Sequence, residues 1–226
     1  MSGSKSQLWE EKFSDNYKPS PLVKLIKKFE TYRAKVISNM IQSDHGVLVD
    51  LACGDGEFIF NHVDQFDKLI GFDIAANRIK KAQALKIAKT SFKVVDLDKG
   101  IPLPDKCVDV VVCEASLSYF YDPEFAISEV YRVLKKGGSF VVQVPNYAYL
   151  PRRVTLLLGG LPKTSSFGGY GDGGALHYFN HSTLLQLLKS QKFSINQILN
   201  SGLLAGWRRL YPTLLSGDIV VKAIKK

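Results

Sequence analysis

Apolar residues recur at three- and four-residue spacings from Leu22 to Ile41, and several lysines fall on the opposite side of that period. This period is that of an amphipathic α-helix, so the pattern predicts one long helix over 22–41. The twenty residues before it are polar and show no period, which is typical of a loosely ordered arm. We therefore expect residues 1–45 to form an N-terminal arm and a cap helix.

From Gly46 onward, short runs of β-branched and aromatic residues alternate with helical stretches. The predicted strands cover 47–51, 69–72, 92–95, 108–113, 139–144, 193–199 and 218–224. The predicted helices cover 56–66, 75–88, 123–134 and 182–190, and two glycines at 137 and 138 stop the third of them. Alternation of this kind predicts an α/β domain over 46–226, with a mainly parallel open sheet and helices on both faces.

The regular alternation lapses between Asn146 and Gly174, a stretch too long for an ordinary connection. We interpret 146–180 as a lid or cap segment. Within it, the run Leu156–Leu158 fits either a helix face packed on the protein, which we favour, or a membrane anchor.

Composition narrows the class of protein without naming a function. The 226 residues carry 30 Lys+Arg against 21 Asp+Glu, a formal charge of +9, which admits an anionic partner such as nucleic acid or a membrane surface. Three cysteines, Cys53, Cys107 and Cys113, fit neither a disulfide framework nor a zinc site. No apolar run reaches the length of a membrane span. We expect a cytoplasmic protein without a metal site, for which only peripheral membrane contact stays open.

The most informative motif is a buried strand that runs into a Gly-x-Gly turn, VLVDLACGDG over 47–56. In open α/β sheets, ligands bind at the carboxyl ends of the strands, and glycines at 54 and 56 let the backbone approach a ligand closely. A dinucleotide-binding turn would need a third glycine where Ile59 stands, and Asp50 would repel a pyrophosphate. The motif therefore favours a cationic ligand over a nicotinamide cofactor.

Three more carboxylates follow predicted strands. Asp73 ends the second strand, from where it can accept from both hydroxyls of a ribose. Asp96 ends the third, and it can accept from an adenine amino group while Leu97 packs on the ring. Glu114 ends the fourth and would face the same ligand from the opposite side.

These motifs occur in order over about 47–145, and there the chain resembles the class I S-adenosylmethionine-dependent methyltransferases. The matching pieces are DLACGDG, GFDIA, VVDLD, DVVVCEASLSYF and EVYRVLKKGGSFVVQVPN. The resemblance implies a Rossmann-like methyltransferase fold of seven strands, the last of them antiparallel, and S-adenosylmethionine as cofactor. It also implies the cofactor-binding residues: Asp50, Ala52, Gly54 and Gly56 for the methionine moiety, Asp73 and Ile74 for the ribose, Asp96 and Leu97 for the adenine, and Glu114 for the edge facing the methyl group.

The resemblance extends more loosely to the rest of the chain. The segments PNYAYLPRRVTLLLGGLPKTSS and HYFNHSTLLQLLKSQKF are similar to family members that act on small molecules. The family's Asn/Asp-Pro-Pro-Tyr signature for amine and amide acceptors is absent, because Glu-Ala-Ser-Leu stands in its place. A small-molecule acceptor is therefore implied.

Methyl transfer from a sulfonium needs positioning and exclusion of water more than covalent help. A hydroxyl acceptor must still lose its proton, so His177 in the cap segment is our candidate general base. Glu114 and His181 are the less favoured candidates. Cys53 and Cys113 are interpreted as small core residues, because nothing pairs them with a base.

The leading hypothesis is a methyltransferase acting on a small molecule, with an oxygen acceptor favoured. One alternative is an RNA methyltransferase, motivated by the basic balance and by the arginine pairs 152–153 and 208–209. Another is a catalytically silent module that keeps the fold and uses Tyr149–Leu161 to bind a membrane surface or a partner. The sequence leaves both alternatives open.

Overall fold

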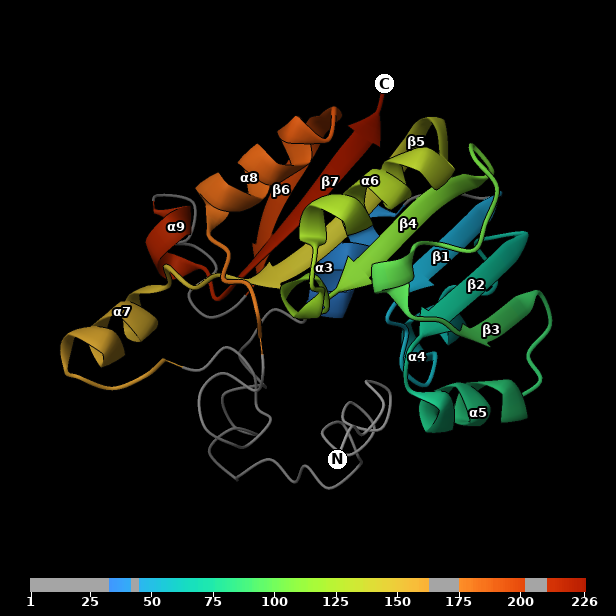
Figure 1. Ribbon diagram of the computed structural model, residues 1–226, viewed down its shortest axis with the longest axis horizontal. Coiled ribbons are helices and arrows are strands. Elements are labelled where there is room, and N and C mark those ends of the chain that lie inside the picture. Colours follow the sequence, from blue (N-terminus) through green and yellow to red (C-terminus); the bar gives the residue numbers. More distant parts are fainter. Residues whose placement is uncertain (1–32, 42–44, 163–174, 202–210) are drawn as a thin grey trace.

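A computed structural model of the chain describes residues 33–41, 45–162, 175–201 and 211–226. Within them, seven strands form one sheet in the order β3-β2-β1-β4-β5-β7-β6 (Figure 1). The strands are β1 Val47–Leu51, β2 Lys68–Asp73, β3 Thr90–Val94, β4 Val108–Glu114, β5 Leu134–Pro145, β6 Phe193–Ser201 and β7 Asp218–Lys225. The helices are α3 Arg33–Met40, α4 Glu57–Phe60, α5 Ala76–Ala84, α6 Pro123–Val133, α7 Leu150–Leu157, α8 His181–Ser190 and α9 Pro212–Leu215, with short 3-10 turns η1 Leu97–Lys99 and η2 Leu117–Tyr119.

The direction of the strands confirms the predicted fold class. Strands β3, β2, β1, β4 and β5 run parallel, whereas β7 lies antiparallel between β5 and β6. The strand order reverses between β1 and β4, so the carboxyl ends of β2, β1 and β4 meet at the switch point where open α/β sheets bind ligands.

Each face of the sheet carries its own apolar core, because side chains alternate along a strand. Helices α6 and α8 cover one face with residues such as Ile127 and Leu184. Helices α3 and α5 cover the other with Ile37 and Ile79 (Figure 1). Along β1 and β4, Leu48 and Val112 belong to this second face.

Several predicted helix bounds are wrong. The helix predicted over 56–66 ends at Phe60, and His62 accounts for the early end: its Nδ1 lies 2.7 Å from the carbonyl oxygen of Phe58, and its Nε2 lies 2.9 Å from Oγ of Ser38. The helix predicted over 75–88 ends at Ala84, because the chain reaches a positive φ of 48° at Lys86. The start predicted at Leu22 lies outside the described residues, which contain helix α3 over Arg33–Met40 within the predicted range.

The glycines at 137 and 138 do not stop helix α6, which ends at Val133. Strand β5 begins directly at Leu134 and pairs there with Val108. The two glycines therefore lie inside the strand, next to a shift in its register with β4.

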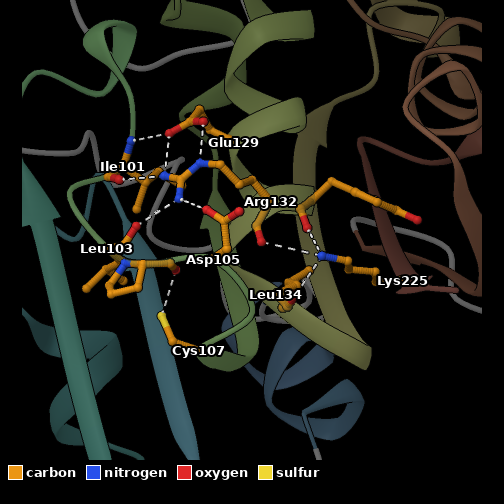
Figure 2. Close-up of polar contacts among 10 residues, drawn as sticks. Ile101, Leu103, Asp105, Cys107, Glu129, Arg132, Leu134 and Lys225 are labelled. Atoms are coloured by element: carbon orange, nitrogen blue, oxygen red, sulfur yellow. Dashed lines mark hydrogen bonds and ion pairs between the residues drawn. The ribbon is translucent and has the colours of Figure 1, made fainter.

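The amino end of the sheet is tied by a network of charged side chains (Figure 2). Arg132 at the end of α6 donates to Glu129 at 2.7 and 2.8 Å and to Asp105 at 2.7 Å. It also donates to the carbonyl oxygens of Ile101 and Leu103, both at 2.9 Å. All five N–H donors of the guanidinium thus have an acceptor, and one side chain joins α6 to the loop that enters β4.

A second cation at this end caps helix α6. Lys225, 7% exposed at the end of β7, donates to the carbonyl oxygens of Tyr131 and Leu134, the latter at 2.8 Å (Figure 2). Its ammonium also lies 4.7 Å from the centre of the Tyr131 ring. Unpaired carbonyls and the partial negative charge of a helix C-terminus are both stabilised by such a cation.

The prediction that Leu156–Leu158 packs against the protein is wrong. Helix α7 buries none of its residues, and Leu157 and Leu158 are 85% and 80% exposed. The helix follows β5 after residues 146–149 and lies past the tip of that strand (Figure 1). Among the described residues, no helix is long and apolar enough to cross a membrane.

Candidate active site at the carboxyl ends of the strands

The turn after β1 has a backbone that few residue types tolerate. Gly54 and Gly56 have φ angles of 57° and 85°. A Cβ added at Gly56 would lie 2.8 Å from the ring of Phe92, so a side chain there would displace a core residue. Ala52 also adopts a positive φ, 58°, which is strained for a residue with a Cβ. Strain of this kind concentrates at functional sites.

Asp73, at the end of β2, holds the turn against its neighbouring strand. Its Oδ2 accepts from the backbone N–H of Gly54 at 2.7 Å, and its Oδ1 accepts from Ala75 at 2.8 Å. A carboxylate offers about four lone-pair positions, so two backbone bonds leave acceptor capacity for a ligand. Ile74 beside it is half-buried.

Asp50 and Glu114 concentrate negative charge beside this turn. Asp50 is 3% exposed, and by strand alternation both side chains lie on the face of the sheet that carries Leu48 and Val112. Burial, reinforced by the negative charges of Glu114 and Asp73, raises the pKa of Asp50 well above its usual value. A buried carboxylate surrounded by like charges is a favourable position for a cationic ligand group.

Asp96 and Leu97 lie at the end of the third strand, and the structure gives both a local role. Asp96 caps η1 by accepting from the N–H of Asp98 at 3.3 Å, and its Oδ2 lies 3.8 Å from Nζ of Lys99. Leu97 is 7% exposed and packs in the core cluster with Val49 and Ile101. The predicted contacts with an adenine remain predictions.

The structure brings His177 to the loop that follows β4. The N–H groups of Leu176 and His177 donate to the carbonyl oxygen of Ser118 at 2.8 and 3.1 Å. Nε2 of His177 lies 3.2 Å from the carbonyl oxygen of Tyr121. Ser118, the residue that anchors this segment, lies four residues after Glu114 in the chain.

His181 occupies a different environment, at the start of α8. Its Nε2 pairs with Oδ1 of Asn200 at 2.8 Å, and burial lowers the pKa of the imidazole. These contacts tie α8 to β6.

The sequence motifs did not identify two buried polar residues. Gln143, on β5 in register with Glu114, is fully buried, and neither atom of its amide has a hydrogen-bond partner among the described residues. Asn146 is also fully buried, and its Nδ2 donates to the carbonyl oxygens of Thr213 and Ser216, both at 2.8 Å. Gln143 could have been identified from the sequence, because it is a polar residue within the apolar run of β5.

The sequence motifs also did not identify Arg78, whose cationic side chain lies against the glycine turn. The guanidinium of Arg78, on α5, occupies the space where a Cβ of Gly54 would be, and it pairs with Asp55 at 3.2 Å. A side chain at Gly54 would have to displace this guanidinium, and the positive φ independently favours glycine there. Ala115, directly after Glu114, has a positive φ of 56° and repeats at β4 the strain seen at Ala52.

Both cysteines interpreted as core residues are buried. Burial raises the pKa of Cys113 to about 12, and burial together with Asp50 raises the pKa of Cys53. Because only the thiolate is strongly nucleophilic, neither thiol is prepared for attack.

The fold and the site together define a class of protein: an open α/β sheet whose last strand in the chain, β7, is antiparallel to its neighbours, with a glycine turn and acidic strand ends. Residues 49–142 match the family model described as a methyltransferase domain. A demethylmenaquinone methyltransferase of Lactococcus lactis is 28% identical over 145 residues, which cover 61% of this chain and 57% of the relative. A 2-methyl-6-phytyl-1,4-hydroquinone methyltransferase of Spinacia oleracea is 33% identical over 45% of this chain and 30% of its own length.

Solved structures give the same fold. An S-adenosylmethionine-dependent methyltransferase from Mesorhizobium loti superposes with a TM-score of 0.64 at 19% identity, covering 84% of this chain and 96% of that one. These matches support a class I S-adenosylmethionine-dependent methyltransferase, a class whose cofactor is S-adenosylmethionine. The matched stretches span less than two thirds of the length of the curated relatives.

Proposed function

We propose that this protein transfers a methyl group from S-adenosylmethionine to a small-molecule acceptor, with an oxygen atom favoured as the acceptor. The observation that carries the proposal is the row of three carboxylates, Asp73, Asp50 and Glu114, on adjacent strands around the glycine turn. A sulfonium cofactor with an amino-acid tail is a cation, and this row has the charge to match it.

The residues present fit the cofactor part by part. Asp73 keeps lone pairs for ribose hydroxyls beside Ile74, while Ala52, Gly54 and Gly56 let the backbone approach the methionine moiety. Asp50 and Glu114 would attract its positive groups. The assignment of Asp96 and Leu97 to the adenine rests on the resemblance to the family motif. When bound, the cofactor supplies an electrophilic methyl group.

His177 is our candidate for taking the proton from a hydroxyl acceptor. A carbonyl oxygen can only accept, so the contact of Nε2 with Tyr121 assigns the imidazole proton to Nε2. Nδ1 then carries the lone pair that a general base needs. Glu114 is the alternative base, since it ends the strand that leads into the same loop.

The acceptor class is supported by the relatives. The two curated relatives described above are named for methylating demethylmenaquinone and 2-methyl-6-phytyl-1,4-hydroquinone, both of them small molecules. A hydroquinone presents hydroxyl groups. These names support a small-molecule acceptor, and they do not fix the acceptor atom.

Calorimetry with S-adenosylmethionine and S-adenosylhomocysteine tests the cofactor site. We expect the wild type to bind both and Asp73→Asn to raise both Kd values at least about tenfold, because hydrogen bonds to a charged group are lost. The matched control is Asp64→Asn, which changes an exposed carboxylate elsewhere and should leave both Kd values unchanged. Absence of binding by the wild type, or equal binding by Asp73→Asn, would contradict the proposal.

Methyl transfer itself is tested with labelled S-adenosylmethionine, a panel of small hydroquinones and catechols, and an RNA preparation. We expect label in a small molecule and a roughly 100-fold lower kcat for His177→Gln, the typical contribution of a general base. Cofactor Kd should stay the same in that variant. Label found in RNA with steep salt dependence would favour the RNA alternative instead. Equal kcat in His177→Gln would remove the histidine from the mechanism.

A further inference from the structure

Helix α7 carries an apolar stripe that faces solvent. Leu150, Val154, Leu157 and Leu158 follow the spacing i, i+4, i+7 and i+8, which places them on one face of the helix. They are 43%, 44%, 85% and 80% exposed, and Leu161 just beyond the helix is 71% exposed. In a helix of a globular protein this spacing normally marks the face that packs on the core. Here the stripe packs on nothing in the described part of the chain.

The segment that carries the stripe contains basic and aromatic residues and no acidic ones. Over 147–162 the chain has two arginines, two tyrosines and no Asp or Glu. Arg153 is exposed on the flank of the stripe, and its Nε donates to the carbonyl oxygen of Ala148 at 2.7 Å. Leucine on one side with arginine and tyrosine beside it is the composition of helices that lie in the interface of an anionic membrane.

The helix is held firmly to the carboxyl end of the sheet. Arg152 donates to the carbonyl oxygens of Asn146 and Gly217, and its guanidinium lies 5.7 Å from the centre of the Tyr149 ring. Asn146 in turn bonds the segment around α9. The stripe is therefore presented on a fixed support at the end of the molecule that carries the candidate active site, past the tip of β5 (Figure 1).

A second copy of the chain is a poor occupant for this surface. An eight-residue helix is about 12 Å long, too short to supply the roughly 800 Å² per partner of a standard interface. A two-fold axis through the stripe would also bring Arg153 of both copies into one interface, where like charges repel. A lipid surface needs no such area from a single helix, and its anionic headgroups complement the arginine.

We propose that α7 is a membrane-contact site, which lies in the interface of an anionic bilayer with Leu157 and Leu158 among the acyl chains and Arg153 at the headgroups. The contact goes beyond methyl transfer and does not depend on it. It would hold the carboxyl end of the sheet toward the lipid surface.

Flotation with vesicles tests the proposal. We expect the wild type to bind phosphatidylglycerol/phosphatidylcholine vesicles more than pure phosphatidylcholine vesicles, and to lose most of this preference at high salt. The double variant Leu157→Ser/Leu158→Ser should lower the partition coefficient at least about tenfold, since burying one leucine alone accounts for that factor. Arg153→Gln should lower it severalfold, on anionic vesicles alone.

The matched control is Leu85→Ser, which changes a leucine of 58% exposure at the end of α5, at the opposite side of the molecule in Figure 1. It should leave vesicle binding unchanged. The double variant should also keep the cofactor Kd and the thermal midpoint of the wild type, which separates this test from that of the methyltransferase proposal. The membrane contact would be overturned by no flotation of the wild type, by equal flotation of the double variant, or by a wild-type dimer that the double variant abolishes. A lower thermal midpoint in the double variant would equally overturn it, because the leucines would then pack on the chain itself.

Discussion

The two ends of the sheet handle charge in opposite ways. At the amino end, Arg132 and Lys225 are surrounded by acceptors, and the pKa of Glu129 is held below its usual value by the hydrogen bonds from Arg132. At the carboxyl end, Asp50 is buried with acidic neighbours, and its pKa is raised by burial and by those charges. The acceptors at the amino end stabilise the fold, whereas the acidic cluster at the carboxyl end lowers its stability and supplies the charge that we propose for cofactor binding.

The same contrast extends to neutral groups and to the backbone. Near the carboxyl ends, Gln143 is buried without a partner among the described residues, and Ala52 and Ala115 hold positive φ angles. These features lower the stability of the fold, and they lie beside the proposed cofactor site. Substitutions that relieve them should stabilise the protein, while substitutions in the amino-end network should do the opposite.

The largest effect is expected from Arg132→Met. The variant removes the charged hydrogen bonds to Glu129 and Asp105 and leaves the carbonyl oxygens of Ile101 and Leu103 without their donor. We expect the free energy of unfolding to fall by about 3 kcal/mol, the usual scale for breaking a partly buried charged cluster. Urea denaturation measures the loss, and Lys136→Met, an exposed neighbour, serves as the control. A change below about 1 kcal/mol would show that the cluster adds little.

Asp50→Asn should have the next largest effect, with the opposite sign. The neutral amide removes the desolvated charge and its repulsion with Glu114 and Asp73, so the ligand-free protein should gain about 1 to 2 kcal/mol at pH 8. Cofactor affinity should fall at least about tenfold, because a charge facing a cationic ligand is lost. Urea denaturation and calorimetry measure the two quantities, with Asp64→Asn as the shared control.

The pH dependence of this gain follows from the sign of the shift. A raised pKa in the fold means that protonated Asp50 is favoured there, so its contribution to stability is present below the unfolded pKa of about 3.9 and is lost as pH rises through the folded pKa. The stability difference between Asp50→Asn and the wild type should therefore grow from pH 5 to pH 8. A difference that shrinks over this range would contradict the unfavourable charge.

Alternation of β-branched runs with helical stretches was sufficient to predict an open, mainly parallel α/β sheet, whereas the seven-strand topology was implied by the family resemblance. The turn after β1 and the carboxylates at the strand ends could be located by the same logic, since each directly follows a predicted strand. Helix ends were harder, because they depend on tertiary contacts such as those of His62 with Ser38 and Phe58. No local pattern contains these partners.

The packing of the cap segment was the feature hardest to predict from the sequence. An apolar run of helical spacing predicts burial, yet Leu157 and Leu158 are exposed because α7 lies beyond the sheet. Likewise, the sequence shows Gln143 only as one polar residue in a strand. The residues packed around it in the structure reveal that its amide is buried without a partner among the described residues. The arginine pair at 208–209, which motivated the RNA alternative, lies outside the described residues.

Gln143→Leu should stabilise the protein by about 1 kcal/mol. Leucine has nearly the same volume and leaves no donor or acceptor unsatisfied, whereas a buried amide without partners costs about 1 to 3 kcal/mol. Urea denaturation measures the gain. The control is Asn146→Leu, another buried amide, whose loss of bonds to Thr213 and Ser216 should destabilise the protein instead. Destabilisation by both variants would mean that Gln143 has a partner in solution, such as an internal water.

The smallest effect tests the strained backbone. Ala52→Gly should raise the free energy of unfolding by about 0.5 kcal/mol, since relief of a left-handed alanine, about 1 to 2 kcal/mol, exceeds the added chain entropy of glycine in the unfolded state, about 0.5 to 1 kcal/mol. The same substitution at Ala84, an exposed helical position in α5, should lower it by a similar amount. Replicate urea melts of both variants resolve the difference in sign, and loss of stability in both would place Ala52 outside the left-handed region. If Ala52→Gly also weakens cofactor binding while it stabilises the fold, the strain at the end of β1 serves to position the backbone for the ligand.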